Sequence, residues 1–548
     1  MAETILQLDP RDNVLVALTT LDLGTYVNFG SAASTLQCQV MQTIPAKHKM
    51  ATKALKPGEV ITMYGMVVGE VVEAIPAGGL ITTSNIRHRA ADYTSARQQV
   101  THPLPDPTQW VGRTFMGYHR ADGQVGTRNY WIVLPLVFCE NRNVDRMREA
   151  LEEELGYGSA RNAWRSHVRD LVQHKVSGNG HQSEDAAQQQ PDRIFPNLDG
   201  IRFLTHQLGC GGTRQDAQAL CGLLAGYIHH PNVAGATVLS LGCQNAQAGM
   251  LLDELRARDP GMSKPVLVFD QQRSGSESAL MTRALDETFA ALVEANRATR
   301  APAPLSALTV GLQCGGSDGF SGISANPTVG YVSDLLVGLG GTTMLSEFPE
   351  LHGVEQELIN RCATDELAER FSNLMQTYAA RARAVHSGFD FNPSPGNIRD
   401  GLITDAIKSA GAARKGGVSP IRGVLDYPEY VTARGLNLQC TPGNDVESVT
   451  AQVGAGSNIV LFTTGLGTPT GNPIAPIVKI SSNSTLAGRM ADIIDFDAGG
   501  IITGATNIPE CAAQLLELSI EVASGKRMTK AELLDQNDFI PWKRGVSL

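Results

Sequence analysis

The chain has 548 residues, of which 42% are hydrophobic and 18% are charged, and its formal net charge is −10 at pH 7. This length exceeds what one hydrophobic core can organise and indicates two to four domains, and the composition is that of an ordered globular protein. Because the chain is acidic and has no run of basic residues interleaved with aromatics, we expect no nucleic-acid partner.

The start of the chain and its cysteines indicate a cytoplasmic protein. The opening sequence MAETILQLDPRD lacks the basic start and apolar core of a signal peptide. No apolar run reaches the roughly 18 residues of a membrane span, so no membrane partner is expected. Nine cysteines without a secretory signal fit reduced thiols.

The first part of the chain, residues 1–92, is predicted to form a small β-rich module. The runs NVLVALTTL, EVITMYGMVVGEVV and GGLITTSNI read as strands, and LKPGE and IPAGG read as the turns between them. Helical periodicity is confined to residues 31–43. The polar, proline-bearing residues 93–114 are predicted to be a linker.

Strands alternate with helices from residue 115 onward, which predicts βαβ units and mostly parallel sheets. NYWIVLPLVF, GIRFLTHQL, GATVLSLG and KPVLVFD read as strands, and helical patterns usually follow them. We assign residues 115–300 to a second α/β domain with a polar insertion at 156–194. Residues 305–548 form a C-terminal α/β domain, after a second candidate linker around 300–307.

Four cysteines follow predicted strands directly, namely Cys139, Cys210, Cys243 and Cys314. The carboxyl ends of parallel strands share one edge of a sheet, where ligands bind. Thiolates suit iron, zinc or an iron–sulfur cluster, whereas a single buried cysteine also serves as a small hydrophobe. The absence of a C-x-x-C pair excludes a zinc ribbon or a thioredoxin motif.

The loops beside these cysteines are rich in glycine and polar residues, as in GCGGTRQD, GCQN and CGGSDGFSG. Such loops let backbone N–H groups approach an anionic ligand. The polar pocket would then include Gln207, Thr213, Arg214, Gln215, Asp216, Gln244 and Asn245. The alternative for Thr213 and Asp318 is an ordinary role in a helix cap or turn.

His48 lies between Lys47 and Lys49 in IPAKHKMA, just before a predicted turn. Neighbouring lysines lower the pKa of an imidazole and attract carboxylates. On local grounds alone, the default interpretation of His48 is an ordinary surface histidine.

The motifs of two other enzyme classes are incomplete. GGSDG at 315–319 matches the G-x-S-x-G of a serine hydrolase, and His352 or His386 could supply the histidine of a catalytic triad. The GFSGISANPTVG that follows delays the helix that a nucleophile elbow requires. GLGTPTG misses the dinucleotide spacing, and neither a P-loop nor H-E-x-x-H occurs, so acyl hydrolysis and NAD- or ATP-dependent chemistry are disfavoured.

Taken in order, the motifs resemble the altronate and galactarate dehydratase family of sugar-acid hydro-lyases over nearly the whole chain. They are IPAKHKMA, YGMVVGEV, GYHRADGQVGTRNYW, GCGGTRQD, HPNVAGATVLSLGCQN, LQCGGSDGFSGISANPTVG, FNPSPGN, TPGND and FTTGLGTPTG. The resemblance implies that the N-terminal module is of the SAF type. One departure is ITTSNI, where members of the family commonly have a histidine-containing run, so Thr82 and Ser84 stand in place of histidines.

The resemblance is greatest to altronate dehydratases and implies a metal-assisted C2–C3 elimination that converts D-altronate to 2-dehydro-3-deoxy-D-gluconate and water. It implies divalent iron or manganese, and an iron–sulfur cluster fits the cysteines equally. We assign acid–base or first-contact roles to His48, Asp318 and Lys415, and metal binding to Cys210, Cys243 and Cys314. Glu347 and Glu350 are alternative metal ligands. The residues expected to hold the substrate are Arg128, Asn129, Arg214, Gln215, Asn245, Ser317, Asn326, Asn397 and Thr464, with Lys415 a further carboxylate partner.

Galactarate dehydratase and sulfolactate sulfo-lyase are the alternative activities on the same scaffold. A non-catalytic sugar-acid binding protein is the alternative of a different class. The resemblance alone implies that the protein is a homo-oligomer, most simply a dimer.

Overall fold

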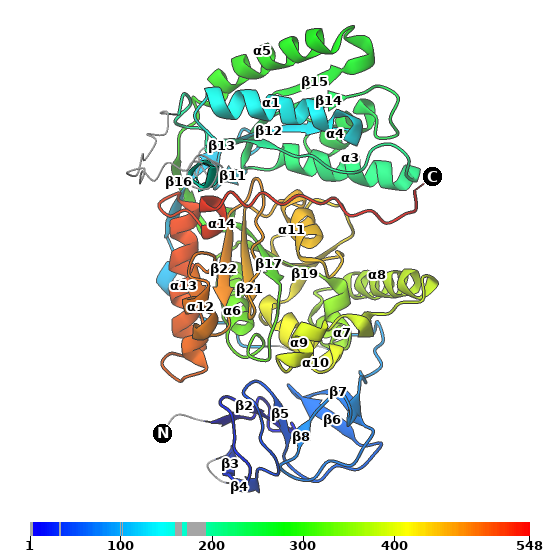
Figure 1. The fold of residues 1–548 in the computed structure, drawn as a ribbon, viewed down its shortest axis with the longest axis vertical. Helices are drawn as coiled ribbons and strands as arrows, with labels where there is room; N and C mark the ends of the chain where they lie inside the picture. The colour runs from blue at the N-terminus through cyan, green and yellow to red at the C-terminus, as the bar shows by residue number, and fades with distance from the viewer. Residues whose placement is uncertain are drawn as a thin grey trace.

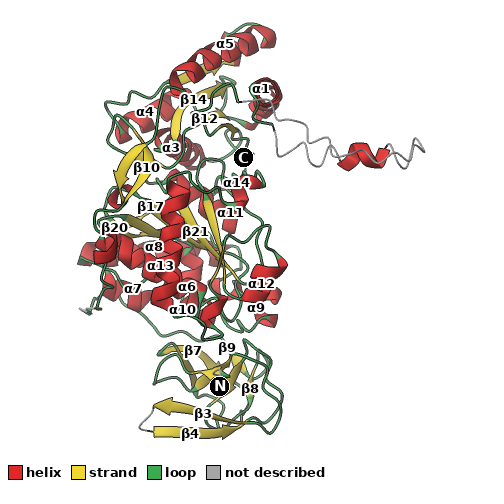
Figure 2. Ribbon diagram, turned by 90° about the vertical axis from the view of Figure 1, so that its left-hand side faces the viewer, coloured by secondary structure: helices red, strands yellow, loops and turns green. Residues whose placement is uncertain are grey.

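The computed structural model describes residues 4–31, 34–98, 100, 102–158, 167–172 and 193–547. Most of the predicted insertion at 156–194 lies outside these residues. The chain forms three bodies in a row, and the C-terminal domain is the middle one (Figure 1). In both views the N-terminal module lies at the opposite end from the second domain (Figure 2).

The N-terminal module is β-rich, as predicted, and its short strands pair in antiparallel fashion. β1 (Ile5–Leu6), β2 (Val14–Ala17), β5 (Lys49–Ala51) and β8 (Leu80–Ile81) form one sheet, in the order β1-β2-β5-β8. β6 (Val60–Met63), β7 (Met66–Val71) and β9 (Ile86–Arg87) form another. β3 (Tyr26–Ser31) and β4 (Ser34–Gln39) form a hairpin.

The hairpin overturns the helical periodicity of residues 31–43. β4 pairs with β3 in antiparallel register, from Tyr26 opposite Gln39 to Ser31 opposite Ser34. Val27 and Cys38 face each other across the pair and are buried in the same small core. Cross-strand pairing of this kind outweighs the periodicity of a short segment.

The second domain contains a parallel sheet in the order β13-β12-β14-β15. Its strands are β12 (Tyr130–Pro135), β13 (Gly200–Phe203), β14 (Val233–Ser240) and β15 (Val266–Asp270). The accompanying helices are α1 (Asn141–Glu154), α3 (Arg214–His229), α4 (Ala248–Arg258) and α5 (Glu277–Ala295). At its base, β10 (Thr114–His119) pairs with β11 (Val125–Gly126) and with β16 (Ala301–Pro304). The candidate linker around 300–307 therefore contains a strand.

The C-terminal domain is built on a parallel sheet in the order β19-β20-β18-β17-β21-β22-β23. The strands are β17 (Thr309–Cys314), β18 (Thr342–Leu345), β19 (Ile421–Leu425), β20 (Gly435–Gln439), β21 (Ile459–Thr464), β22 (Ile477–Ser481) and β23 (Phe496–Asp497). The helices are α6 (Ala325–Gly338), α7 (Glu355–Arg361), α8 (Asp365–Ala384), α9 (Pro395–Arg399), α10 (Asp405–Ala412), α11 (Asp445–Gly454), α12 (Ser484–Arg489), α13 (Ile508–Ala523) and α14 (Lys530–Leu533). The fold class predicted from the sequence is confirmed.

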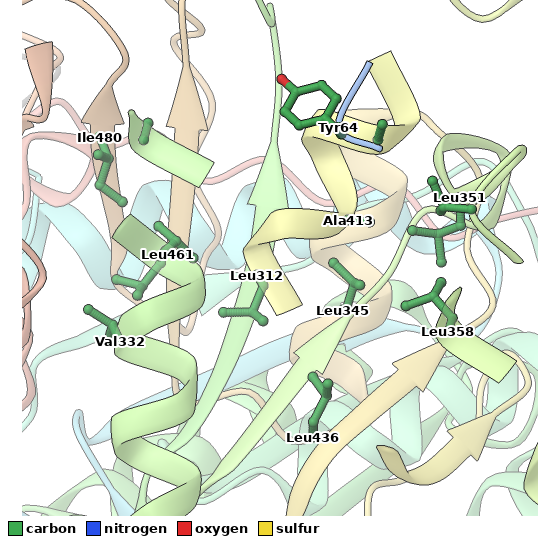
Figure 3. Packing of buried hydrophobic residues seen from close by; sticks show 14 of the residues in the cluster. Tyr64, Leu312, Val332, Leu345, Leu351, Leu358, Ala413, Leu436, Leu461 and Ile480 are labelled. Carbon is green, nitrogen blue, oxygen red and sulfur yellow. The ribbon is translucent and has the colours of Figure 1, made fainter. Parts of the chain in front are cut away.

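One hydrophobic core joins the N-terminal module to the C-terminal domain. It contains Val68 and Tyr64 of the module together with Leu312 and Leu345 of the large sheet. Figure 3 shows Tyr64 close to Ala413, and the guanidinium of Arg414 lies 5.2 Å from the Tyr64 ring centre. Apolar burial across this boundary fixes the module against the domain.

The C-terminal segment runs back between the second and C-terminal domains (Figure 1). Glu532 pairs with Arg128 of the second domain, and the backbone N–H groups of Arg544 and Gly545 donate to Asp216. No helix in the described parts of the chain has the length and apolarity needed to cross a bilayer.

Candidate functional site

The order of the C-terminal sheet creates a topological switch point beside β17. The chain continues from β17 to β18 on one side, whereas β21 adds to the other side. The loops that leave the carboxyl ends of these strands diverge there, and open parallel sheets bind ligands in the crevice that results. Cys314 ends β17, Thr464 ends β21, and Glu347 follows β18.

A cluster of buried ionisable side chains occupies this position, and we call it the Cys314 cluster: Cys314, Glu347, Glu350, Lys408 and Lys415. The Cys314 thiol donates to Glu350 Oε2 at 3.1 Å, and Lys415 Nζ lies 2.6 Å from Cys314 Sγ. Lys415 Nζ also lies 3.5 Å from Glu347 Oε2, and Lys408 Nζ lies 2.6 Å from Glu350 Oε1. Charges that are buried this deeply require such partners.

The two carboxyl groups of the cluster have opposite pKa shifts. Burial, reinforced by the charge of Glu350, raises the pKa of Glu347 to about 8. Burial alone would raise the pKa of Glu350 too, but Lys408 and Lys415 lower it below its ordinary value. Burial also raises the pKa of the Cys314 thiol. At neutral pH the cluster therefore holds a protonated Glu347, an ionised Glu350 and a neutral thiol.

Glu347 is held in an unusual conformation. Its φ of 66° lies in the left-handed region, and its backbone N–H donates to Thr441 Oγ1 at 2.9 Å. Glu347 Oε1 is buried without a hydrogen-bond partner. Left-handed non-glycine residues concentrate at functional sites, and the unpartnered Oε1 of the protonated carboxyl is available for a bound molecule.

The loop after β17 continues to Asp318, which anchors the N-terminal module. The carboxylate of Asp318 is fully buried and accepts from the hydroxyls of Ser321 and Ser482, each at 2.8 Å. Lys47 Nζ of the module lies 3.0 Å from Asp318 Oδ2 and 2.8 Å from Asp400 Oδ1. The ion pairs bring the loop around His48 to the C-terminal domain.

Two glycines permit this approach of the module. A Cβ atom at Gly319 or Gly401 would lie 2.6 Å or 2.4 Å from the carbonyl oxygen of Lys47. Lys47 itself has a φ of 75°. Beside it, Lys49 Nζ is buried and donates to the carbonyl oxygens of Lys47 and Gly401 at 3.0 and 2.7 Å.

His48 is half-buried at this interface. Burial lowers its pKa below the ordinary value, and the charges of Lys49 and Lys47 lower it further, in the predicted direction. Nδ1 lies 3.2 Å from the Ala46 carbonyl oxygen, so it carries the proton of the neutral ring. Nε2 is then left as a proton acceptor.

The structure gathers one part of the predicted site residues around the 314–319 loop. Asn397 Nδ2 donates to the Ser317 carbonyl oxygen at 2.8 Å, and Asn326 Oδ1 accepts from Thr463 Oγ1 at 2.6 Å. Cys314 and Asp318 are separated by a span of at most about 14 Å, because each residue extends the chain by about 3.5 Å. The residues that the fold brings to this region are His48, Cys314, Ser317, Asp318, Asn326, Asn397, Lys415 and Thr464.

The remaining predicted site residues lie in the second domain. Arg128 is buried and engaged by Glu532 at 2.6 and 3.0 Å, and Asn129 bonds to backbone within its own domain. Arg214 and Gln215 are exposed at the start of α3, which Thr213 caps by accepting from the Asp216 N–H. Asn245 donates to the carbonyl oxygen of Cys210. The capping alternative for Thr213 is the observed one.

The three cysteines predicted to bind one metal do not meet. Cys210 and Cys243 are exposed and follow β13 and β14, whereas Cys314 is buried at the end of β17 in a different sheet. Among the described residues, neither Cys210 nor Cys243 belongs to a group of three candidate ligands within 4.8 Å of one another. Of the three, only Cys314 lies at the end of a strand, because β13 ends at Phe203 and β14 ends at Ser240, and the two sheets have separate edges.

Ser317 lacks the surroundings of a hydrolase nucleophile. Gly315 and Gly316 precede it, and Gly316 has a φ of 60°. A Cβ at Gly315 would lie 2.2 Å from Asp445 Oδ2, which accounts for the glycine by close packing. No hydrogen bond joins Ser317 to a histidine within the described residues.

Three groups of side chains within the described residues have the ligand spacing of a metal site. In the group Cys314, Glu347 and Glu350, ammonium groups already contact the donor atoms. In the group Asp122, His229 and Asp259, Gln124 Nε2 already contacts two of the side chains, at 2.7 Å from Asp122 Oδ2 and 3.0 Å from His229 Nε2. In the group His88, His352 and Asp405, the atoms His88 Nδ1 and both Asp405 oxygens have no partner. The third group fits a divalent metal best.

Several residues of the site escaped the analysis of the sequence. Lys408 lies within α10 and Asp400 directly follows α9, and neither belongs to a recognisable motif. Glu347 and Glu350 were expected only as alternative metal ligands. His88 follows the ITTSNI run and could have been noticed as a histidine three residues beyond Asn85. Asp405 directly follows a helix-capping threonine, which hides it among ordinary helix starts.

Family models match all three bodies of the chain. They are described as the altronate/galactarate dehydratase SAF domain (residues 3–89), the D-galactarate dehydratase/altronate hydrolase second domain (117–296) and the D-galactarate/altronate dehydratase C-terminal domain (305–547).

Full-length relatives support the same family. The chain is 33% identical over 541 residues to altronate dehydratase of Escherichia coli K12, covering 98% of both proteins. It is 31% identical over 555 residues to altronate dehydratase of Bacillus subtilis 168, covering both completely. It is 34% identical over 498 residues to galactarate dehydratase (L-threo-forming) of E. coli K12, covering 90% of this chain and 88% of that one. The chain belongs to the altronate and galactarate dehydratase family.

Proposed function

We propose that this protein dehydrates D-altronate to 2-dehydro-3-deoxy-D-gluconate. The observation that carries the proposal is the buried Glu347 carboxyl at the switch point of the C-terminal sheet: its Oε2 contacts Lys415, its Oε1 has no hydrogen-bond partner, and its pKa is raised to about 8. A C2–C3 elimination needs a base for the C2 proton, an acid for the C3 hydroxyl and positive charge near the substrate carboxylate.

His48 is the proposed base. Its lowered pKa keeps the imidazole neutral at pH 7, and Nδ1 is engaged by the Ala46 carbonyl. Nε2 removes the proton from C2, and the electron pair of that C–H bond forms the C2–C3 double bond. Lys47 holds the His48 loop in place through Asp318 and Asp400, so Asp318 acts as a positioning residue.

Glu347 is the proposed acid. The C3–O bond breaks as Glu347 Oε1 donates its proton, and the hydroxyl leaves as water. The enol that results tautomerises to the 2-keto acid. Lys415 and Lys408 together supply two positive charges against the single negative charge of Glu350, so the cluster attracts an anionic substrate.

The family implies a divalent iron or manganese ion. Such an ion would supply Lewis-acid stabilisation of the negative charge that develops on the substrate carboxylate as the C2 proton is removed. His88, His352 and Asp405 are the residues that fit it.

A substrate panel tests the proposal. Metal-supplemented enzyme is incubated with D-altronate, galactarate and sulfolactate, and keto acid is measured as its semicarbazone. We expect D-altronate to give the highest kcat/KM. Preference for galactarate, or release of sulfite from sulfolactate, would assign the chain to a related reaction. Tight binding of these acids without turnover would indicate a binding protein instead.

We also propose that the protein works in the cytoplasm. All nine cysteines are free, including the exposed Cys139, Cys210 and Cys243. Free exposed thiols fit a reducing compartment.

A further inference from the structure

His88, His352 and Asp405 come from three separated segments that meet between the N-terminal module and the C-terminal domain. His88 follows β9 of the module, His352 follows the 3-10 turn Phe348–Leu351, and Asp405 begins α10. Their candidate ligand atoms all lie within 4.8 Å of one another. The two imidazole rings are stacked, with centres 5.4 Å apart and an interplanar angle of 27°.

Close backbone packing holds the segments in this arrangement. Gly353 has a φ of 94°, and a Cβ there would lie 3.2 Å from Ala90 Cβ and 3.3 Å from Ala406 Cβ. A glycine next to His352 therefore allows the segments that carry His88 and Asp405 to approach. The conformation and close packing of the backbone at Gly353 therefore fix the positions of the three segments.

Three donor atoms of this group have no hydrogen-bond partner among the described residues. Asp405 is only 1% exposed, yet neither of its carboxylate oxygens accepts a hydrogen bond. His88 Nδ1 is also buried and unpartnered. Buried polar atoms are nearly always paired, and a buried carboxylate without a partner is costly. A cation between them would satisfy all three atoms at once.

Glu355 orients the His352 imidazole, as second carboxylates do for metal-binding histidines. His352 Nδ1 lies 2.9 Å from Glu355 Oε1, and Glu355 Oε2 accepts from the Gly353 N–H at 2.7 Å. A carboxylate that holds the far nitrogen of an imidazole fixes the ring for metal binding through the other nitrogen. His352 Nε2 is thereby left for the metal.

We propose that His88, His352 and Asp405 bind one divalent transition-metal ion across the boundary between the N-terminal module and the C-terminal domain. Two imidazoles and one carboxylate suit ferrous iron, manganese or zinc, and three protein ligands leave coordination positions open. Glu350 precedes His352 by two residues and Lys408 follows Asp405 by one helical turn, so the ion lies next to the Cys314 cluster. The inference concerns metal binding and does not depend on the proposed reaction.

X-ray absorption on the full-length wild-type protein tests the ligand set without any variant. Chelator-treated protein is reloaded with about one equivalent of Zn²⁺, and the first coordination shell is measured. We expect nitrogen and oxygen neighbours at about 2.0–2.1 Å with imidazole scattering, and no sulfur at about 2.3 Å. A sulfur neighbour would place the ion at a cysteine and overturn the proposal.

Variants then assign the ligands. Asp405→Asn and His88→Gln are each expected to abolish stoichiometric Mn²⁺ binding in an EPR titration, and Glu355→Gln to weaken it by about 10- to 100-fold. Asp365→Asn is the matched control, because Asp365 likewise follows a capping threonine at a helix start but is 83% exposed. His386→Gln controls for the loss of an exposed histidine.

A further variant separates the two candidate groups. Cys314→Ser removes the thiol of the Cys314 cluster and is expected to keep the wild-type Mn²⁺ affinity. Near-ultraviolet circular dichroism confirms that each variant is folded. Retention of wild-type affinity in folded Asp405→Asn, or its loss in folded Cys314→Ser, would contradict the assignment.

Discussion

At the scale of single residues, Glu347 is the group whose protonation the proposed reaction uses. Its pKa of about 8 means that the acid form predominates at neutral pH and is lost as the pH rises through that value. The rate should therefore decline above pH 8. Glu347→Gln removes the transferable proton and is expected to lower kcat by about 10²- to 10⁴-fold.

A pH profile distinguishes this role from a structural one. In the residual activity of Glu347→Gln, the decline above pH 8 should be absent. Glu369→Gln, which changes an exposed glutamate, serves as the control. A folded Glu347→Gln variant with the wild-type profile would remove Glu347 from the reaction.

His48 governs the opposite side of the pH profile. Because burial lowers its pKa below the ordinary value, the base form persists to acidic pH and the rate should fall only below pH 6.5. His48→Asn keeps a side-chain amide for the Ala46 carbonyl but has no basic nitrogen. We expect kcat to decrease by about 10²- to 10⁴-fold and the acidic decline to disappear. His386→Asn should match the wild type.

The cysteines illustrate what can be read at the residue scale from sequence. Each of the four follows an apolar run, and this placed Cys314 correctly at the end of β17. Which strands share a sheet depends on contacts between distant segments, and no local pattern reports those. The metal group is hidden for the same reason, since His88 and Asp405 are 317 positions apart, as their numbers give.

At the scale of secondary-structure elements, α3 depends on its cap. Thr213 Oγ1 accepts from the Asp216 N–H, and the Asp216 carboxylate accepts from Thr213 and from the C-terminal segment. Thr213→Ala should lower the free energy of unfolding by about 1 kcal/mol. Thr213→Ser keeps the hydroxyl and should cost much less. Urea denaturation followed by circular dichroism measures both, and equal losses would show that the cap contributes nothing.

Strands with continuous apolar runs were predictable, because a parallel sheet is buried on both faces and its strands are therefore apolar at nearly every position. β12 and β21 are completely buried and were both expected. The segment 31–43 was misleading because its hairpin depends on pairing with β3. β16 was missed because prolines occupy two of its four positions, as in APAP, and proline disfavours strands.

At the scale of the whole molecule, Lys49 links the stability of the module boundary to pH. Burial lowers its pKa to about 7, whereas the unfolded chain keeps an ordinary value of 10.5. Between these values the unfolded state binds more protons, so stability should rise with pH over that interval. The slope from this group is at most about 1.4 kcal/mol per pH unit.

The measurement is the difference in melting temperature between wild type and Lys49→Met from pH 7 to pH 10. The wild-type curve should rise relative to the variant as the pH increases. Lys53→Met, which changes an exposed lysine of the same module, should run parallel to the wild type. Parallel curves for Lys49→Met would show that Lys49 stays charged in the folded protein.

The pairing of β10 with β16 has a consequence for the order of folding. Thr114 lies opposite Pro304 in this pair, so the chain enters and leaves the second domain at neighbouring points. Lys47 and Asp400 are 353 positions apart, and folding of the second domain roughly halves the effective loop between them. Each halving lowers the entropy cost of loop closure by about 0.6 kcal/mol. The second domain therefore acts as a folded insertion that shortens the effective loop between Lys47 and Asp400 and lowers the entropy cost of bringing them together.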